Sequence, residues 1–327
     1  MLKYIVKRLL WMIPVILGVL VIVFVLSEIT PGDPVDNIVG TDATVEAREA
    51  AREAYGLNDP APVRFFRYVW GIISRGDLGT SYSNGQPVAK EIAHRFPITI
   101  KLTLLSVFVA LLIALPLGVL SAVKQYSWVD NVTMVGALFF VSVPQFWMAL
   151  MMMLVFSVKL QILPASTSDL SNPLAWIMPV AMIGLNNVGN LARVTRSSML
   201  EIIRQDYIRT ARAKGQKHSA VIFKHGLRNA LIPVIANVGN TIGVSLGGAV
   251  VAESIFSIPG VGQYMLNAIN NRNWPAVQGG IIVLAASFSV VMLLVDLVYA
   301  FVDPRLKSQF DTKKIRVHHN PSRGGIV

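Results

Sequence analysis

Six long runs of apolar residues divide the chain, and polar segments of different lengths separate them. A helix needs about 20 predominantly apolar residues to cross the hydrocarbon core of a bilayer. Each run is close to that length, so the pattern predicts an all-α polytopic membrane protein with six transmembrane helices. The runs cover residues 9–26, 98–123, 132–158, 176–194, 231–251 and 279–302.

Composition supports this class. Of the 327 residues, 54% are hydrophobic and 14% are charged, well below the roughly 25% charged residues of a soluble domain. The net charge of +11 would suggest nucleic-acid binding in a soluble chain. In a membrane protein it first indicates basic residues kept on the cytoplasmic side, so no nucleic-acid partner is expected. The absence of cysteine excludes disulfides and thiolate metal sites.

The first apolar run lies where a signal peptide would lie. A signal peptide has an apolar core of about 7–15 residues and a small-residue cleavage site. This run is longer, and Ser27-Glu28-Ile29-Thr30 offers no such site. We therefore expect a retained first span that begins in the cytoplasm, with cleavage as the alternative.

Residues 31–97 form the long polar stretch before the second run, and their acids and bases nearly balance. Residues 45–55 predict a short charged helix that Gly56 ends. Residues 64–73, RFFRYVWGII, have the aromatic and basic mixture of a segment at a membrane interface. The simplest interpretation of the whole stretch is an extracytoplasmic cap.

Charge then predicts the orientation. With the N-terminus inside, most of the basic residues fall on cytoplasmic segments, and most of the others lie in the one long outer loop. The positive-inside rule is weak for long loops. The N- and C-termini are both predicted to be cytoplasmic, and so is the segment between the fourth and fifth spans.

That segment, residues 206–233, is basic and helix-prone. Two apolar stripes predict two helices, and Gly215 between them suits a left-handed helix end. The first stripe is Met199, Ile203, Tyr207 and Ala211, and the second is Ala220, Phe223, Leu227 and Leu231. The basic side of this helix-turn-helix suits either anionic lipid headgroups or an acidic groove on a partner, and charge alone does not separate the two.

The segment DYIRTARAKG at 206–215, with His225, LRNAL at 227–231 and Pro233, resembles a known motif. It is similar to the cytoplasmic Glu-Ala-Ala loop of bacterial ABC-importer permeases, in the form of the dipeptide, oligopeptide and nickel permease family. The Glu-Ala-Ala triplet appears as Arg209-Thr210-Ala211, and the closing Leu-Pro appears as Ile232-Pro233. Both departures are usual in the peptide branch.

The resemblance extends over nearly the whole chain. PGDP at 31–34, GDLG at 76–79, RFP at 95–97 and DPR at 303–305 occur in the family's order, and residues 253–275 resemble its last outer loop. In that loop Asn273 stands where an aspartate is common, which puts any charge-dependent role there in doubt.

The resemblance implies a type I ABC importer permease with a coupling loop between spans four and five. This loop would insert into a cleft on an ATP-binding subunit. The residues implied at the contact are Asp206, Arg209, Thr210, Ala211, Arg212, Ala213, Lys214, Gly215 and His218. The implied partners are a second homologous permease, two ATP-binding subunits and an extracytoplasmic binding protein, in a bacterial inner membrane.

No G-x-x-x-x-G-K-[ST] sequence occurs in the chain, so ATP and Mg are expected on the partner subunits and no cofactor is expected here. The chain is expected to be a non-catalytic subunit. The expected divisions are residues 1–30 with the first span, 31–97 as the outer loop, 98–302 as a core that includes the coupling loop 197–230, and 303–327 as a cytoplasmic tail.

Polar residues within the spans predict a translocation pathway. Such side chains need partners in hydrocarbon, so they face protein or water. The alternative is hydrogen bonding between helices. The candidates are Asn186, Asn190, Asn237, Asn240, Thr103 and Ser106.

Asp296 is an acid deep in an apolar run, and such acids suggest function. Structural pairing with Arg193 or Arg196 is the favoured interpretation, ahead of proton relay.

His218 and His225 lack companion acids at metal-ligand spacing, so no metal site is expected.

Two other classes of membrane protein carry different signatures. An ion-coupled secondary transporter would show paired intramembrane acids or broken helices in two repeats, and a membrane enzyme would show a clustered catalytic set. Neither is evident.

The resemblance to the family implies peptides as the expected substrates, with nickel chelates, glutathione and some sugars as alternatives.

Overall fold

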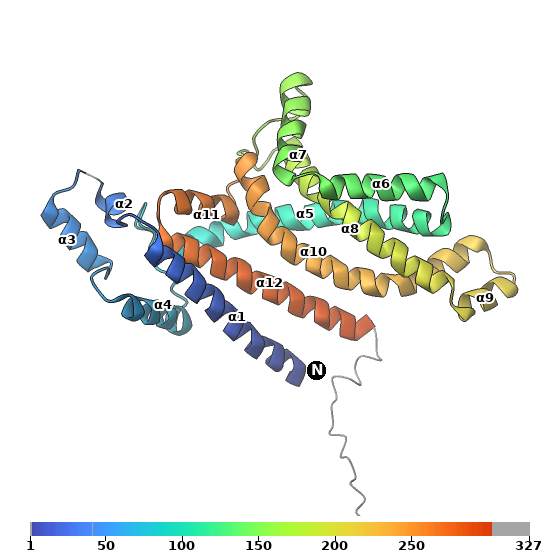
Figure 1. Cartoon of the computed structure of the whole chain (residues 1–327), viewed down its shortest axis with the longest axis horizontal. Helices are drawn as coiled ribbons and strands as arrows, with labels where there is room; N and C mark the ends of the chain where they lie inside the picture. Colours follow the sequence, from blue (N-terminus) through green and yellow to red (C-terminus); the bar gives the residue numbers. More distant parts are fainter. Residues whose placement is uncertain (1, 41, 303–327) are drawn as a thin grey trace, which may run out of the picture.

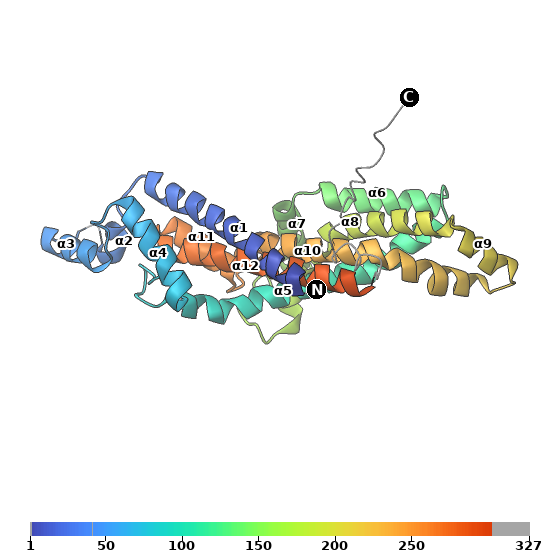
Figure 2. The ribbon, with the colours of Figure 1, turned by 90° about the horizontal axis from the view of Figure 1, so that it is seen from below.

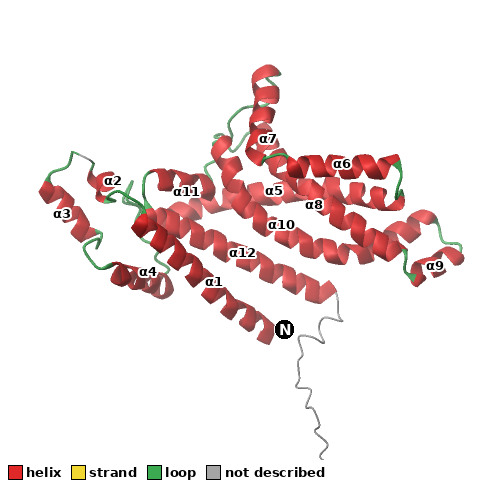
Figure 3. Cartoon of the chain, in the orientation of Figure 1, coloured by secondary structure: helices red, strands yellow, loops and turns green. Residues whose placement is uncertain are grey.

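The computed structural model describes residues 2–40 and 42–302. Within these residues every regular element is a helix, apart from one isolated bridge between Thr80 and Pro87 (Figure 3). The predicted all-α class is confirmed.

The long helices are α1 (Leu2–Ile29), α5 (Val88–Val123), α8 (Ile177–Ile203), α10 (Arg228–Ile255) and α12 (Trp274–Val302). Shorter helices form the segment predicted as an outer cap, and this name is kept for α2 (Val35–Val39), α3 (Val45–Ala54) and α4 (Ala61–Arg75). The remaining elements are α6 (Trp128–Ser142), α7 (Gln145–Met152), η1 (Met153–Lys159), η2 (Pro173–Trp176), α9 (Asp206–Ala213), η3 (Ala220–Leu227) and α11 (Val261–Asn270).

Five helices are long and apolar enough to cross a membrane, and a bent pair brings the number to six if it counts as one span. The bent pair corresponds to the predicted run 132–158. Its two halves, α6 and α7–η1, meet at an angle of 98°, so this run forms a sharply bent helix pair. Val143 is extended and Pro144 has no N–H to donate, which breaks the helix at this point.

The other spans match their predicted runs but extend further. α5 begins at Val88, before the predicted start at residue 98, and α8 continues to Ile203, past residue 194. The extra turns are more polar than the runs, so a hydropathy window does not detect them. Pro97 and Pro116 lie inside α5 without ending it, because membrane bundles tolerate internal proline.

α8 lies at the centre of the bundle. In the apolar part of the η2–α8 span 61% of residues are buried, against 11% in α1 and 6% in α12. Gly118 of α5 and Gly189 of α8 permit close packing. A Cβ on Gly118 would lie 2.6 Å from the Cβ of Thr195, and one on Gly189 would lie 2.3 Å from the carbonyl oxygen of Ala137. The largely exposed apolar faces of α1 and α12 are left for lipid or other subunits.

The two ends of the molecule are built differently. Figure 1 shows α2, α3 and α4 at one end of the long axis and α9 at the other, and Figure 2 shows the same separation from below. α1 and α12 pack side by side, and Arg8 of α1 pairs with Asp296 of α12 at 3.2 Å. The predicted pairing of Asp296 with Arg193 or Arg196 is therefore wrong, because Asp296 pairs with Arg8 instead.

Candidate coupling segment and transport core

The segment after α8 begins with a break in the helix. Gln205 is extended, and α9 then begins at Asp206. Ile208 and Ala211 of α9 are buried against Val221 of η3. Tyr207 is 44% exposed, so the predicted first stripe is wrong at that position. The break at Gln205 interrupts the helical periodicity of α8. The buried side of α9 therefore begins at Ile208 instead of at Tyr207.

The turn that follows has the predicted form. α9 ends at Ala213, and Gly215 adopts a left-handed conformation with φ of +72°. Its N–H donates to the carbonyl of Arg212 at 2.9 Å. A Cβ at Gly215 would meet nothing within 4 Å. Backbone conformation, rather than space, therefore calls for glycine here.

The second half of the segment is a π-helix, η3. Val221, Ile222 and Gly226 are buried, whereas Phe223 is 60% exposed. The predicted second stripe is wrong at Phe223, because a π-helix has more residues per turn than the 3.6 on which the stripe depends. Figure 1 shows α9 and the turn at the tip of the molecule.

The structure brings the predicted contact residues together on this tip. Ala211 is buried, and the others are exposed, namely Asp206, Arg209, Thr210, Arg212, Ala213, Lys214, Gly215 and His218. His225 bonds Gln216 through its Nε2 at 2.8 Å, which closes the turn. No cluster of three or more potential metal ligands is found in residues 2–40 and 42–302.

Polar residues of α8 make contacts with three other elements. Asn190 donates to Asn237 of α10 at 3.3 Å. Asn186 donates to the carbonyl of Phe140 in α6 at 3.2 Å and accepts from Gln145 of α7 at 3.2 Å. These hydrogen bonds join different helices. They fit the alternative interpretation of the candidates, hydrogen bonding between helices, which the sequence left open beside a pathway.

The remaining pathway candidates divide into two kinds. Asn240 is exposed on α10. Thr103 and Ser106 of α5 are completely buried, and Ser106 donates to the carbonyl of Leu102 at 2.8 Å. In this conformation, burial keeps those two hydroxyls away from any water-filled surface of the chain.

A buried ion pair was missed by the sequence analysis. Asp130, at the start of α6, is 2% exposed. Arg196 of α8 donates to it through Nε and Nη2, both at 2.7 Å, and the Ser121 hydroxyl of α5 also donates to it. The pair joins three helices at the α9 side of the bundle. In the sequence, only the spacing of Ser127 and Asp130, which is typical of the start of a helix, pointed to Asp130.

A buried carboxylate at the other side was also missed. Glu253, near the end of α10, is completely buried. It accepts from Thr99 Oγ1 of α5 at 2.6 Å and from the N–H of Gln263 at 3.1 Å, at the first turn of α11. A Cβ on Gly260 would lie 2.2 Å from Glu253, so the glycine makes room for the carboxylate. Glu253 thus ties the α10–α11 connection to α5.

Asn273, the residue that departs from the family pattern, fits its site as an amide. It is 2% exposed, and its Nδ2 donates to the hydroxyls of Ser81 and Ser83 at 2.8 and 3.2 Å. Its Oδ1 accepts from the N–H of Tyr82 at 3.0 Å. An ionised carboxylate accepts only, so aspartate could replace these two amide bonds only if both serine hydroxyls turned to donate to it.

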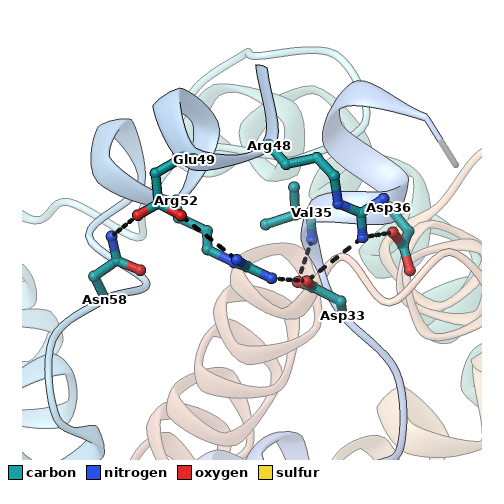
Figure 4. Close-up of polar contacts among 7 residues, drawn as sticks. All are labelled: Asp33, Val35, Asp36, Arg48, Glu49, Arg52 and Asn58. Carbon is teal, nitrogen blue, oxygen red and sulfur yellow. Dashed lines mark hydrogen bonds and ion pairs between the residues drawn. The ribbon is translucent and has the colours of Figure 1, made fainter. Parts of the chain in front are cut away.

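Ion pairs hold the outer cap together (Figure 4). Asp33 binds Arg52 at 2.5 Å and lies 3.7 Å from Arg48, which also pairs with Asp36. Partial burial raises the pKa of Asp33, but hydrogen bonds from the Val35 N–H and from Arg52 outweigh it and hold the pKa below its ordinary range. The predicted charged helix is confirmed as α3, which ends before Gly56.

Comparison with known proteins agrees with this arrangement. Residues 114–308 match the family described as binding-protein-dependent transport system inner membrane component, and residues 1–103 match its N-terminal companion. The chain is similar to the dipeptide transport system permease protein DppB of Alkalihalophilus pseudofirmus, at 40% identity over 94% of this chain and all of that protein. It is also similar to the glutathione transport system permease protein GsiC of Pectobacterium atrosepticum, at 38% identity over 94% and 99%.

The fold is shared with a solved structure. An inward-facing structure of the MetNI methionine ABC transporter contains a chain that aligns with a TM-score of 0.57 at 18% identity, covering 66% of this chain and 97% of that one. The family's permeases are non-catalytic, and ATP is hydrolysed on a separate subunit. The chain belongs to the binding-protein-dependent transport system inner membrane component family, as a permease subunit of an ABC importer.

Proposed function

We propose that this permease forms half of the translocation pathway for di- or oligopeptides delivered by an extracytoplasmic binding protein. The similarity to a dipeptide permease, over 94% of this chain and all of that protein, supports this substrate class. The similar glutathione permease keeps glutathione, itself a small peptide, as the second candidate. A second homologous permease would supply the other half, and two ATP-binding subunits would bind ATP and Mg.

The coupling role is proposed for the α9 tip, which consists of α9 and the turn at Gly215. It projects at the end opposite the outer cap (Figure 1). Its buried face, Ile208 and Ala211, packs on η3, which runs directly into α10, while its N-terminal end follows α8. Movement of α9 would therefore reach α8 and α10 together. We propose that the tip and both chain termini face the cytoplasm, as the distribution of basic residues predicts.

Two matched glycine variants test the coupling role. Gly215 and Gly85 both have left-handed φ, +72° and +66°, and a Cβ on either would meet nothing within 4 Å. Valine therefore imposes a similar backbone penalty of about 1–2 kcal/mol at each. The two positions lie at opposite ends, so only Gly215→Val should disturb the contact with the ATP-binding subunit.

The assay uses the full complex in proteoliposomes. We expect Gly215→Val to reduce ATP-driven uptake at least tenfold and to abolish stimulation of ATP hydrolysis by the loaded binding protein, while Gly85→Val keeps both. Wild-type uptake and stimulation in Gly215→Val would refute the coupling role. Reproducible failure of any ATP-binding subunit to copurify in stoichiometric amount would refute the importer assignment itself.

Substrate class needs a separate measurement. The receptor that delivers substrate to the complex is purified and titrated with dipeptides, longer peptides, glutathione and a nickel chelate. Preferential binding of peptides supports the proposal. Preferential binding of the nickel chelate would refute peptides as the substrate class and would not affect the coupling role.

A further inference from the structure

An apolar groove lies between the last turns of α5 and η3. Its volume is about 640 Å³, and its walls include Leu115, Leu120 and Val123 of α5 with Ile222, Phe223 and Leu227 of η3. The π-helix shapes this groove, since it buries Ile222 and leaves Phe223 60% exposed. Among the described residues that line the groove, His218 alone carries an ionisable group.

Neighbouring side chains place the groove at membrane depth. α5 crosses the bundle and ends at Val123. Directly after it come Tyr126 and Trp128, which are 82% and 76% exposed. Tyrosine and tryptophan concentrate at the membrane–water interface. With Tyr126 and Trp128 at this interface, the groove would lie on its hydrocarbon side, within reach of the acyl chains of one leaflet.

Basic residues flank the groove in the sequence. Lys124 follows Val123, Lys217 precedes His218, Lys224 follows Phe223 and Arg228 follows Leu227. The nearest acids on the segment are Glu201 and Asp206, and Asp206 already lies 3.8 Å from Arg209. Basic pockets between helices on the cytoplasmic side of a membrane protein suit phospholipid headgroups. An apolar slot whose lining residues have basic neighbours in the sequence suits an amphipathic ligand, with an acyl chain in the slot and a phosphate that those bases bind.

We propose that the groove binds an anionic phospholipid of the inner leaflet, with an acyl chain between α5 and η3 and its phosphate against the flanking bases. The proposal rests on the cytoplasmic placement of the coupling segment under the proposed function. η3 joins the coupling turn to α10, so a bound lipid contacts the element through which α9 would act. Part of the basic charge of the segment then serves lipid, and the exposed face of α9 stays available to the partner.

Photolabelling of the complete importer tests this site. The complex is placed in nanodiscs that contain a trace of phosphatidylglycerol or phosphatidylcholine with a diazirine in one acyl chain, and labelled peptides are mapped by mass spectrometry. We expect the phosphatidylglycerol probe to label α5 near Leu120 and η3 near Phe223 at least fivefold more than the phosphatidylcholine probe. Equal labelling by both probes would overturn the proposal, because it would indicate unselective boundary lipid.

Two pairs of variants separate the groove from its surroundings. Leu120→Trp fills the groove, whereas Leu112→Trp lies on the same helix, is 59% exposed in the wild type and is outside the groove. We expect labelling to fall at least fivefold in the first and to stay unchanged in the second. Equal labelling of both variants would overturn the acyl-chain site.

The headgroup contact has its own controls. Lys124→Gln with Lys224→Gln should remove the preference for phosphatidylglycerol, whereas Lys90→Gln with Lys159→Gln, both exposed and away from the groove, should keep it. Retained preference in the first pair would overturn the proposal. Labelling replaced by crosslinks to another subunit at Leu120 would also overturn it. Copurification of the ATP-binding subunits is measured on the same samples. Their absence would refute the importer assignment, whereas their presence without selective labelling would refute the lipid site alone.

Discussion

At the end that carries α2, α3 and α4, charged side chains bind one another, whereas those of α9, the turn and η3 are mostly exposed and unpaired. Asp33, Asp36, Arg48 and Arg52 form one connected cluster, and Arg64 pairs with Glu28 at 2.6 Å. Within α9, the turn and η3, the one ion pair among the described residues is Arg209 with Asp206 at 3.8 Å.

The difference indicates what each end needs from outside. Polar groups that are satisfied within the chain set a defined conformation without a partner. Charges that are exposed and unpaired contribute little to stability, but they remain available for binding. We therefore expect substitutions on the outer side to change stability and substitutions on the α9 face to change function.

The largest effect is expected from Glu253→Ala. The substitution removes the acceptor of the Thr99 hydroxyl and the Gln263 N–H, and each unsatisfied buried group costs about 1–3 kcal/mol. We expect the free energy of unfolding to fall by about 3 kcal/mol in mixed-micelle denaturation. Glu201→Ala, an exposed acid on the α9 side, is the control and should leave it unchanged. Equal effects would remove the contrast between the ends.

A smaller loss is expected from Asn273→Asp. The carboxylate cannot donate to Ser81 and Ser83 as the amide does, so both hydroxyls would have to turn and donate to it, and a charge would be buried at a position that is 2% exposed. We expect the free energy of unfolding to fall by about 2 kcal/mol. Asn271→Asp introduces the same charge two residues away on an exposed position and should be neutral. If Asn273→Asp were as stable as the wild type, the amide would not be needed as a donor.

The ion-pair cluster predicts a pH dependence. The pKa of Asp33 is lowered in the folded protein, so its contribution to stability is present above the unfolded pKa of about 3.9 and is lost as pH falls through the folded value. Asp33→Asn should lower the free energy of unfolding by about 1 kcal/mol or less at pH 7. The difference from the wild type should shrink as pH falls below about 4; a constant difference would exclude the carboxylate as its cause.

The smallest change in stability is expected at the α9 end. Arg209 is 77% exposed and its one ion pair is long, so Arg209→Gln should change the free energy of unfolding by less than about 0.5 kcal/mol. Uptake by the reconstituted complex should nevertheless fall. Unchanged uptake with reduced stability would reverse the contrast between the two ends.

Local signals predicted most of the fold. Apolar runs located the five long spans and the bent pair because hydropathy is a property of neighbouring residues. Gly215 marked the turn because its left-handed backbone is a single-residue requirement. The stripes failed at Tyr207 and Phe223, where a break and a π-helix change the phase that a 3.6-residue period assumes.

Long-range pairing could not be predicted in the same way. Arg196 lies 66 residues from Asp130, and Asp296 pairs with Arg8 near the other end of the chain. Charge and burial indicate that an intramembrane acid needs a partner, but only the packing of the helices selects which one. The candidate contact residues followed from a linear motif, so their grouping on one tip was predictable, whereas the burial of Thr103 and Ser106 was not.

The close contacts of α8 also restrict how the bundle can deform. Where α8 passes α5 and α6, a single added carbon at Gly118 or Gly189 would overlap a neighbour, and Arg196 fastens the same helices through Asp130. Close-packed surfaces of this kind resist sliding. Torque applied at α9 would therefore turn α5, α6 and α8 as one rigid block about the surrounding helices, with no axial slip of α8 between them.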